Sequence, residues 1–161
     1  MYQEEQSEVL SLVKGGVILK YNSVKIKLLR GWEEVKNMNF IDELQIIDEM
    51  PAMNNRKSLF NNNIPGGTRH CEWLMINEEY YLSIQASEYH YCIPRGLIPL
   101  EDYTHFEMAL IFEGTITTDM SIIKGFDRYD ELMDCFDDCI FSEVPKDLIE
   151  DLYRWLTVKY N

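Results

Sequence analysis

The residues of this chain best suited to chemistry are the carboxylates of one short segment, residues 127–138, with the sequence DRYDELMDCFDD. The segment holds six acidic side chains and a single arginine. The acidic residues are Asp127, Asp130, Glu131, Asp134, Asp137 and Asp138. On one continuous helix these side chains would face solvent together, because residues three, four, seven or eleven apart lie on the same side. We therefore expect an acidic stripe about 16 Å long on a helix over residues 128–140.

The predicted stripe would carry roughly one charge per 3 Å, close to the spacing of about 3.4 Å between phosphates along one strand of DNA. Such a surface would attract a basic surface of another protein, and charge pairing of this kind raises the rate and specificity of association. A plain solvated face that keeps the protein soluble is the alternative interpretation. A calcium site is disfavoured, because the segment lacks the Asp-x-Asp/Asn-x-Asp/Asn-Gly spacing of a calcium-binding loop.

A second candidate contact surface is aromatic. Residues 87–95 (SEYHYCIPR) place Tyr89 and Tyr91 close to Arg95, and tyrosine and arginine are enriched at the centres of protein interfaces. We take Tyr89, Tyr91 and Tyr103 as candidate anchors for a partner. The alternative is a strand end followed by a turn, with the tyrosine rings packed on a hairpin.

A catalytic interpretation rests on His105 and Glu107, which are two residues apart and so share one face of a predicted strand. Polar residues of the neighbouring strand that could join them are Ser83, Gln85, Ser87 and Tyr89. Histidine, glutamate and serine together can perform acid–base or acyl-transfer chemistry. However, the chain has no Gly-x-Ser-x-Gly turn and no glycine-rich phosphate loop. A small hydrolase or transferase is therefore the alternative, and a non-enzymatic role is favoured.

The remaining candidate ligands are cysteine and histidine: Cys71, Cys92, Cys135 and Cys139, with His70 and His90. Their spacings match no paired-thiol zinc signature. We predict no metal and no cofactor, with the cysteines reduced and acting as small apolar residues.

The elements that must position these residues follow from periodicity. Residues 4–14 read as a helix, and residues 16–21 and 24–29 as two strands. A helix capped by Asn39 is expected over residues 40–47. Residues 50–69, rich in Asn, Pro and Gly, are expected to form a long loop.

The second half begins with a predicted hairpin around Asn77 and Glu78, followed by a strand over residues 105–112. Pro145 is expected to open a last helix, whose apolar stripe is Leu148, Leu152, Trp155 and Leu156. Strands and helices come in runs, which favours an α+β fold. We predict a largely antiparallel sheet of four to six strands with two C-terminal helices packed on it.

The charge is unevenly divided over the 161 residues. Residues 1–70 hold nine acidic and nine basic side chains, whereas residues 71–161 hold nineteen and six and carry the whole net charge of −13. The length predicts a single domain, residues 1–161. The N-terminal residues do not resemble a signal peptide, and no apolar run approaches a membrane span. We expect a cytoplasmic protein that binds neither membranes nor nucleic acid directly, because anionic lipids and phosphates repel it.

Together these features predict an inhibitor or regulator that docks its carboxylates on a basic protein, for example on the nucleic-acid-binding surface of an enzyme. By analogy, small acidic proteins of phages and mobile elements, including anti-CRISPR proteins, counter host nucleases in this way. The alternative within the same class is a toxin-neutralising immunity protein or adaptor whose acidity matches a basic partner. The oligomeric state stays open.

Overall fold

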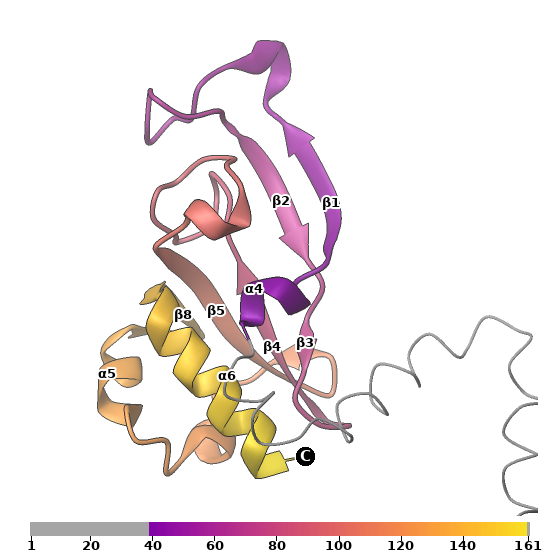
Figure 1. The fold of residues 1–161 in the computed structure, drawn as a ribbon, viewed down its shortest axis with the longest axis vertical. Helices are drawn as coiled ribbons and strands as arrows, with labels where there is room; N and C mark the ends of the chain where they lie inside the picture. The colour runs from indigo at the N-terminus through magenta and orange to yellow at the C-terminus, as the bar shows by residue number, and fades with distance from the viewer. Residues whose placement is uncertain (1–38, 161) are drawn as a thin grey trace, which may run out of the picture.

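A computed structural model describes residues 39–160 of the chain (Figure 1). The predicted helix 4–14 and the predicted strands 16–21 and 24–29 lie outside the described residues. The helices are α4 (Phe40–Glu43), α5 (Tyr129–Asp134) and α6 (Lys146–Tyr160), with short 3-10 turns η1 (Met53–Asn55), η2 (Leu100–Asp102) and η3 (Met120–Ile123). The strands are β1 (Ile46–Pro51), β2 (Gly67–Cys71), β3 (Leu74–Met75), β4 (Tyr80–Gln85), β5 (His105–Phe112), β6 (Thr115–Ile116), β7 (Phe136–Asp137) and β8 (Ile140–Pro145).

The strands form two antiparallel sheets. Five strands of the larger sheet run in the order β3-β4-β5-β8-β7, and β6 pairs with β5 outside this path. Strands β1 and β2 pair with each other as a separate two-stranded ribbon. The prediction of an α+β fold with an antiparallel sheet is confirmed. Figure 1 shows α6 lying along the larger sheet and the ribbon extending beyond one end of it.

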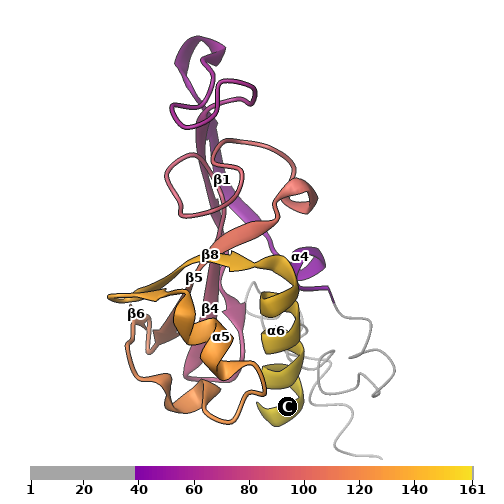
Figure 2. The same cartoon turned by 90° about the vertical axis from the view of Figure 1, so that its left-hand side faces the viewer.

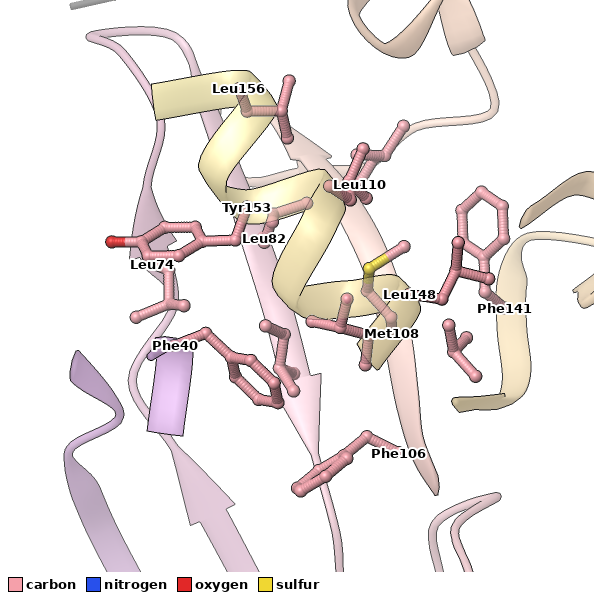
Figure 3. Packing of buried hydrophobic residues seen from close by; sticks show 14 of the residues in the cluster. Phe40, Leu74, Leu82, Phe106, Met108, Leu110, Phe141, Leu148, Tyr153 and Leu156 are labelled. Carbon is pink, nitrogen blue, oxygen red and sulfur yellow. The ribbon is translucent and has the colours of Figure 1, made fainter. Parts of the chain in front are cut away.

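The core lies between the sheet and the C-terminal helix. The predicted apolar stripe of α6 is confirmed: Leu148, Leu152 and Leu156 are fully buried, and Trp155 is partly buried against the same cluster. The stripe faces buried side chains of β4 and β5, among them Leu82, Phe106, Met108 and Leu110 (Figure 3). Each fully buried apolar side chain contributes roughly 1.5–3 kcal/mol, so this contact is a main source of the stability of the fold.

The central hairpin forms as predicted. Leu82 and Leu74 are register partners on β4 and β3, and the side chain of Asn77 accepts hydrogen bonds from the backbone N–H groups of Glu79 and Tyr80. This local Asx geometry replaces a backbone turn. It fixes the start of β4, which then pairs along its length with β5.

The segment before the ribbon differs from its prediction. Asn39 caps α4 as expected, with its Oδ1 accepting from the N–H of Ile41 at 3.0 Å. The helix nevertheless ends at Glu43, and residues 46 and 47 belong to β1 instead of a helix reaching residue 47. Because Ile46 and Ile47 are adjacent β-branched residues, they suit an extended strand as well as a helix.

The predicted loop over residues 50–69 is only partly a loop. Its ends belong to β1 and β2, and the connection between them covers residues 52–66. Within the connection, Lys57 and Pro65 form an isolated antiparallel bridge. Figures 1 and 2 show the ribbon and this connection at the opposite end of the molecule from α5 and the C-terminal end of α6.

Candidate functional site

The acidic segment does not form the single helix that its spacing predicts. Helix α5 ends at Asp134, and the chain then forms the short β7–β8 hairpin. Phe141 is fully buried there and its ring contacts that of Phe136 at 5.0 Å between centroids. Asp138 sits in the turn with φ +59°, a left-handed conformation that aspartate tolerates better than most residues. The predicted helix over residues 128–140, and with it the continuous 16 Å stripe, is therefore wrong.

The six carboxylates are nevertheless all exposed. Asp130, Glu131 and Asp134 lie on α5, with Asp127 just before it. Asp137 and Asp138 lie in the β7–β8 hairpin. The negative charge thus covers two neighbouring elements instead of one helix face.

One of the six is neutralised within the chain by Arg128. This arginine pairs with Glu131 on α5, and with Asp147 and Asp151 on α6, at 2.6, 3.0 and 2.7 Å. The hydrogen bonds that Arg128 donates lower the pKa of Glu131, and donating to Glu131 and Asp151 raises the pKa of Arg128 itself. Arg128 therefore ties α5 to α6. Among residues 39–160, no lysine or arginine forms an ion pair with the other five carboxylates.

The structure adds acidic groups that sequence reasoning missed. A depression of about 590 Å³ lies between η2 and the start of α6. It is lined by Glu101, Asp102, Asp147 and Glu150 together with Asn39, Tyr103, Thr104 and Lys146. Burial raises the pKa of Glu150. Because these carboxylates come from segments more than 40 residues apart, no local spacing could have grouped them.

The three candidate tyrosines do not share one environment. Tyr89 and Tyr91 are 56% and 44% exposed, as an anchor requires. Tyr103 is only 1% exposed; its hydroxyl donates to the carbonyl of Gly96 and accepts from the N–H of Ile98. Burial raises the pKa of Tyr103 to about 12. Tyr103 therefore holds the 96–103 connection from inside and does not lie where a partner could contact it.

The exposed tyrosines belong to a loop, residues 87–97, which we call the tyrosine loop. Arg95 lies over the Tyr91 ring at 4.5 Å and over the Phe60 ring at 5.1 Å from the centroids. Phe60 is 58% exposed and comes from the 52–66 connection. Aromatic side chains and arginine therefore gather on one surface, which is the composition of interface anchors.

A buried carboxylate positions this loop. Glu88 is fully buried and accepts two hydrogen bonds from Arg56, at 2.7 and 3.0 Å. It also accepts from the backbone N–H groups of Leu59 (2.7 Å) and Gly67 (2.9 Å). The Arg56 hydrogen bonds lower the pKa of Glu88. Gly67 must be glycine, since its φ is +142° and a Cβ there would meet the carbonyl of Met50 at 2.5 Å.

The tyrosine loop and the acidic hairpin are linked through β8. The carbonyl of Tyr91 accepts from the N–H of Glu143 on β8, and Ile140 on the same strand pairs with Asp137. Three strand residues span about 10 Å. The exposed rings and the hairpin carboxylates are therefore close enough for one partner to contact both.

No family model matches this chain, and no curated protein or solved structure does either.

The two residues of the predicted catalytic pair, His105 and Glu107, form hydrogen bonds with different partners. The Glu107 carboxylate accepts from the N–H of Tyr91 at 3.0 Å, and the His105 ring bonds to the hydroxyl of Thr104 at 2.9 Å. Gln85, as predicted, stands opposite Glu107 on β4. The side chain of Gln85, however, accepts a hydrogen bond from the N–H of Cys71 and donates one to its carbonyl. His105 and Glu107 share no hydrogen bond within residues 39–160, and neither lines the depression between η2 and α6.

His90 has more of the features of a reactive group than His105. Its Nδ1 lies 2.9 Å from the hydroxyl of Ser87, and its ring meets that of His70 edge to face at 5.8 Å. Burial lowers the pKa of His90. Ser87 itself is fully buried, so its hydroxyl is not open to a substrate. Within the described part of the chain, no three His, Cys, Asp or Glu side chains are arranged to hold a metal ion.

All four cysteines are free thiols. Cys71 and Cys92 are buried, as expected for small apolar residues, and burial raises the pKa of Cys92 to about 11. Over residues 39–160, no helix has the length and apolar character that crossing a membrane requires.

Proposed function

We propose that this chain is a protein-binding inhibitor or regulator that docks an acidic surface on a basic surface of a partner protein. The acidic surface consists of Asp127, Asp130, Asp134, Asp137 and Asp138. The observation that carries the proposal is that these five carboxylates are exposed and have no cationic partner within the described residues. Like charges gathered in this way repel one another, and a cationic partner would relieve that repulsion.

The tyrosine loop supplies the second half of the proposed contact. Charge pairs at an interface rim mainly steer association and select the partner, whereas buried aromatic side chains carry most of the affinity. The Tyr89 hydroxyl accepts from Arg56, the Tyr91 N–H donates to Glu107, and Tyr91 lies next to β8. Both rings are therefore available to bury against a partner that the carboxylates attract. The protein would act in the cytoplasm, and a partner that normally holds nucleic acid there would present the required basic surface.

In this proposal the protein resembles nucleic acid in its negative charge, but not in the helical arrangement of the phosphates. The carboxylates are spread over α5 and the β7–β8 hairpin. The evenly spaced acidic stripe that the sequence predicts on one helix therefore does not form the docking surface. Docking therefore depends on the overall electrostatic field of the surface and on individual ion pairs with the partner. Salt weakens both, because the screening length is about 10 Å at 0.1 M salt.

The test is a triple charge reversal, Asp130→Lys, Asp134→Lys and Asp137→Lys. Asp138 is left intact because its left-handed backbone would strain a lysine. The tagged wild-type chain should capture nucleic-acid-binding proteins from a lysate of its host cells at 50 mM salt. The captured protein should be released at 500 mM salt and by added double-stranded DNA.

The triple variant should capture at least about tenfold less, because reversing three charges changes the net charge of the docking surface by about six units. A matched control reverses three exposed carboxylates elsewhere, Asp48, Glu79 and Asp102, and so makes the same change in net charge. Equal capture by the triple variant and the control, or capture that 500 mM salt and DNA leave unchanged, would contradict the proposal.

A further inference from the structure

A second depression lies on the larger sheet, away from the acidic surface. Its volume is about 440 Å³. It is lined by Ile47, Cys71, Glu72, Trp73, Glu78, Tyr81, Glu113 and Gly114. These residues come from β1, the end of β2, the β3–β4 hairpin and the β5–β6 turn. The site therefore exists only in the folded chain.

Two aromatic side chains, Trp73 and Tyr81, line this depression. The rings of Trp73 and Tyr81 lie 6.3 Å apart between centroids, with their planes tilted by 57°. Trp73 is 43% exposed although its neighbours Cys71 and Leu74 are buried. An exposed tryptophan in a concave site offers a ring face to a ligand.

Three glutamates also line the depression. Glu72, Glu78 and Glu113 are all exposed and come from three separate segments. The sequence places no lysine or arginine between Arg69 and Arg95, or between Arg95 and Lys124. Within residues 39–160, none of the three glutamates forms an ion pair.

Several other aromatic rings in the molecule receive a cation from the chain itself. Arg95 lies over Tyr91, and Lys159 lies over Trp155 at 4.3 Å from the ring centroid. Over Trp73 and Tyr81, by contrast, no cation from residues 39–160 is placed. The depression thus combines a ring face that attracts cations with unpaired carboxylates that attract them too.

We propose that this depression binds an arginine side chain of the partner protein. The guanidinium group is planar, stacks on aromatic faces and pairs with carboxylates through two parallel hydrogen bonds. It is also more weakly hydrated than the ammonium group of lysine, so it loses less on entering a partly apolar site. The inference rests on the proposed function, because it names one residue that the basic partner inserts.

The inference is tested on the free, full-length chain, without the partner. The probe is a tri-arginine peptide, and its neutral counterpart is tri-citrulline, which has nearly the same shape without the charge. Binding is followed by NMR through the indole N–H signals of Trp32, Trp73 and Trp155, and the variant Trp73→Phe identifies the signal of Trp73. Tri-arginine should shift the Trp73 signal, and tri-citrulline should not.

Paired substitutions locate the binding site. Glu78→Gln with Glu113→Gln should weaken the binding of tri-arginine by about tenfold, since two charge-assisted contacts are lost. Glu101→Gln with Asp102→Asn removes the same charge outside the depression, and should change the affinity by less than about twofold. Both pairs are exposed, so neither is expected to disturb the fold.

The inference is overturned if the Trp73 signal does not move, if tri-citrulline moves it equally, or if the two pairs weaken binding to the same extent. The triple variant at Asp130, Asp134 and Asp137 separates this result from the proposed function. A Trp73 response that survives in that variant supports the arginine site even where partner capture is lost. Capture that depends on those three residues, with an unresponsive Trp73, leaves the proposed function standing and removes the arginine site.

Discussion

Two regions of this molecule are held together by different physics. The sheet body, comprising β3 to β8 with α5 and α6, has an apolar interior in which the stripe of α6 packs on β4 and β5. The ribbon end, comprising β1, β2, their connection and the tyrosine loop, has an interior of mainly polar groups, with Cys71 and Cys92 as its members of the apolar core. No residue from Ile46 to His70 belongs to the apolar core, and all six residues of β1 are exposed.

The polar residues buried in the described part of the chain show the contrast most clearly. Five of the six lie in the ribbon end or at its junction with β4: Ser58, Arg69, Gln85, Ser87 and Glu88. Gln85 joins the two sheets by bonding both the N–H and the carbonyl of Cys71. Ser58 joins the connection to the tyrosine loop through the carbonyl of Arg95.

This difference bears on function. The burial of apolar side chains stabilises a fold but depends little on the orientation of the contacting groups. A hydrogen bond, by contrast, constrains both the distance and the angle between donor and acceptor. A polar interior therefore suits a region whose task is to hold exposed rings such as Tyr89 and Tyr91 in a defined position. It also makes the ribbon end sensitive to the loss of any one partner, because a buried polar group left unpaired costs roughly 1–3 kcal/mol.

The largest expected effect is in the sheet body. Leu152→Ala should lower the free energy of unfolding by about 3 kcal/mol, because it removes a fully buried side chain and leaves a cavity. Urea unfolding followed by circular dichroism measures this. Val158→Ala, on the exposed side of the same helix, should change it by less than about 0.5 kcal/mol. A small effect at Leu152 would contradict the assignment of the core to α6.

The next effect is local to the ribbon end. Glu88→Gln keeps the shape of the side chain but cannot accept from Arg56, Leu59 and Gly67 together, so it should cost about 2 kcal/mol. Hydrogen exchange at the amides of Leu59 and Gly67 should accelerate, while Leu110 on β5 stays protected. The exposed Glu79→Gln serves as the control. Equal acceleration at Leu110 would show that the two regions open as one unit.

The same network predicts how pH affects the ribbon end. The pKa of Glu88 is lower in the folded chain than its unfolded value of about 4.3. The stabilisation it gives is therefore complete above the unfolded value, and it is lost as pH falls through the folded one. The exchange of Leu59 and Gly67 should accelerate only in acid, below about pH 4, and Glu88→Gln should remove this dependence.

The smallest effect concerns the surface of the sheet body. Arg128→Ala breaks the ion pairs that join α5 to α6, and should lower the free energy of unfolding by about 1 kcal/mol. Lys124→Ala removes the same charge from an exposed position without an ion pair in the described structure and should have almost no effect. High salt should reduce the difference between the two variants, and a difference that 1 M salt leaves unchanged would contradict an electrostatic origin.

The local sequence pattern was enough to predict the structure wherever the interactions that form an element lie within one segment. The stripe of α6 has a period that only a helix can bury on one side. The hairpin at Asn77 follows from a side chain that bonds its own backbone, and the alternation of Phe106, Met108 and Leu110 predicts the buried face of β5. In these places the nearest neighbours in the sequence supply the decisive interactions.

Tertiary structure decided the rest, because several local patterns suit two conformations equally well. Residues 136–141 (FDDCIF) fit a helix by spacing and a hairpin by their central aspartates, and burial of Phe141 against the sheet selects the hairpin. The sequence alone determined how much negative charge the second half carries. The folded chain determined which carboxylates stay unpaired, that Glu88 lies inside, and that Tyr103 does too, because these outcomes depend on which distant segments pack together.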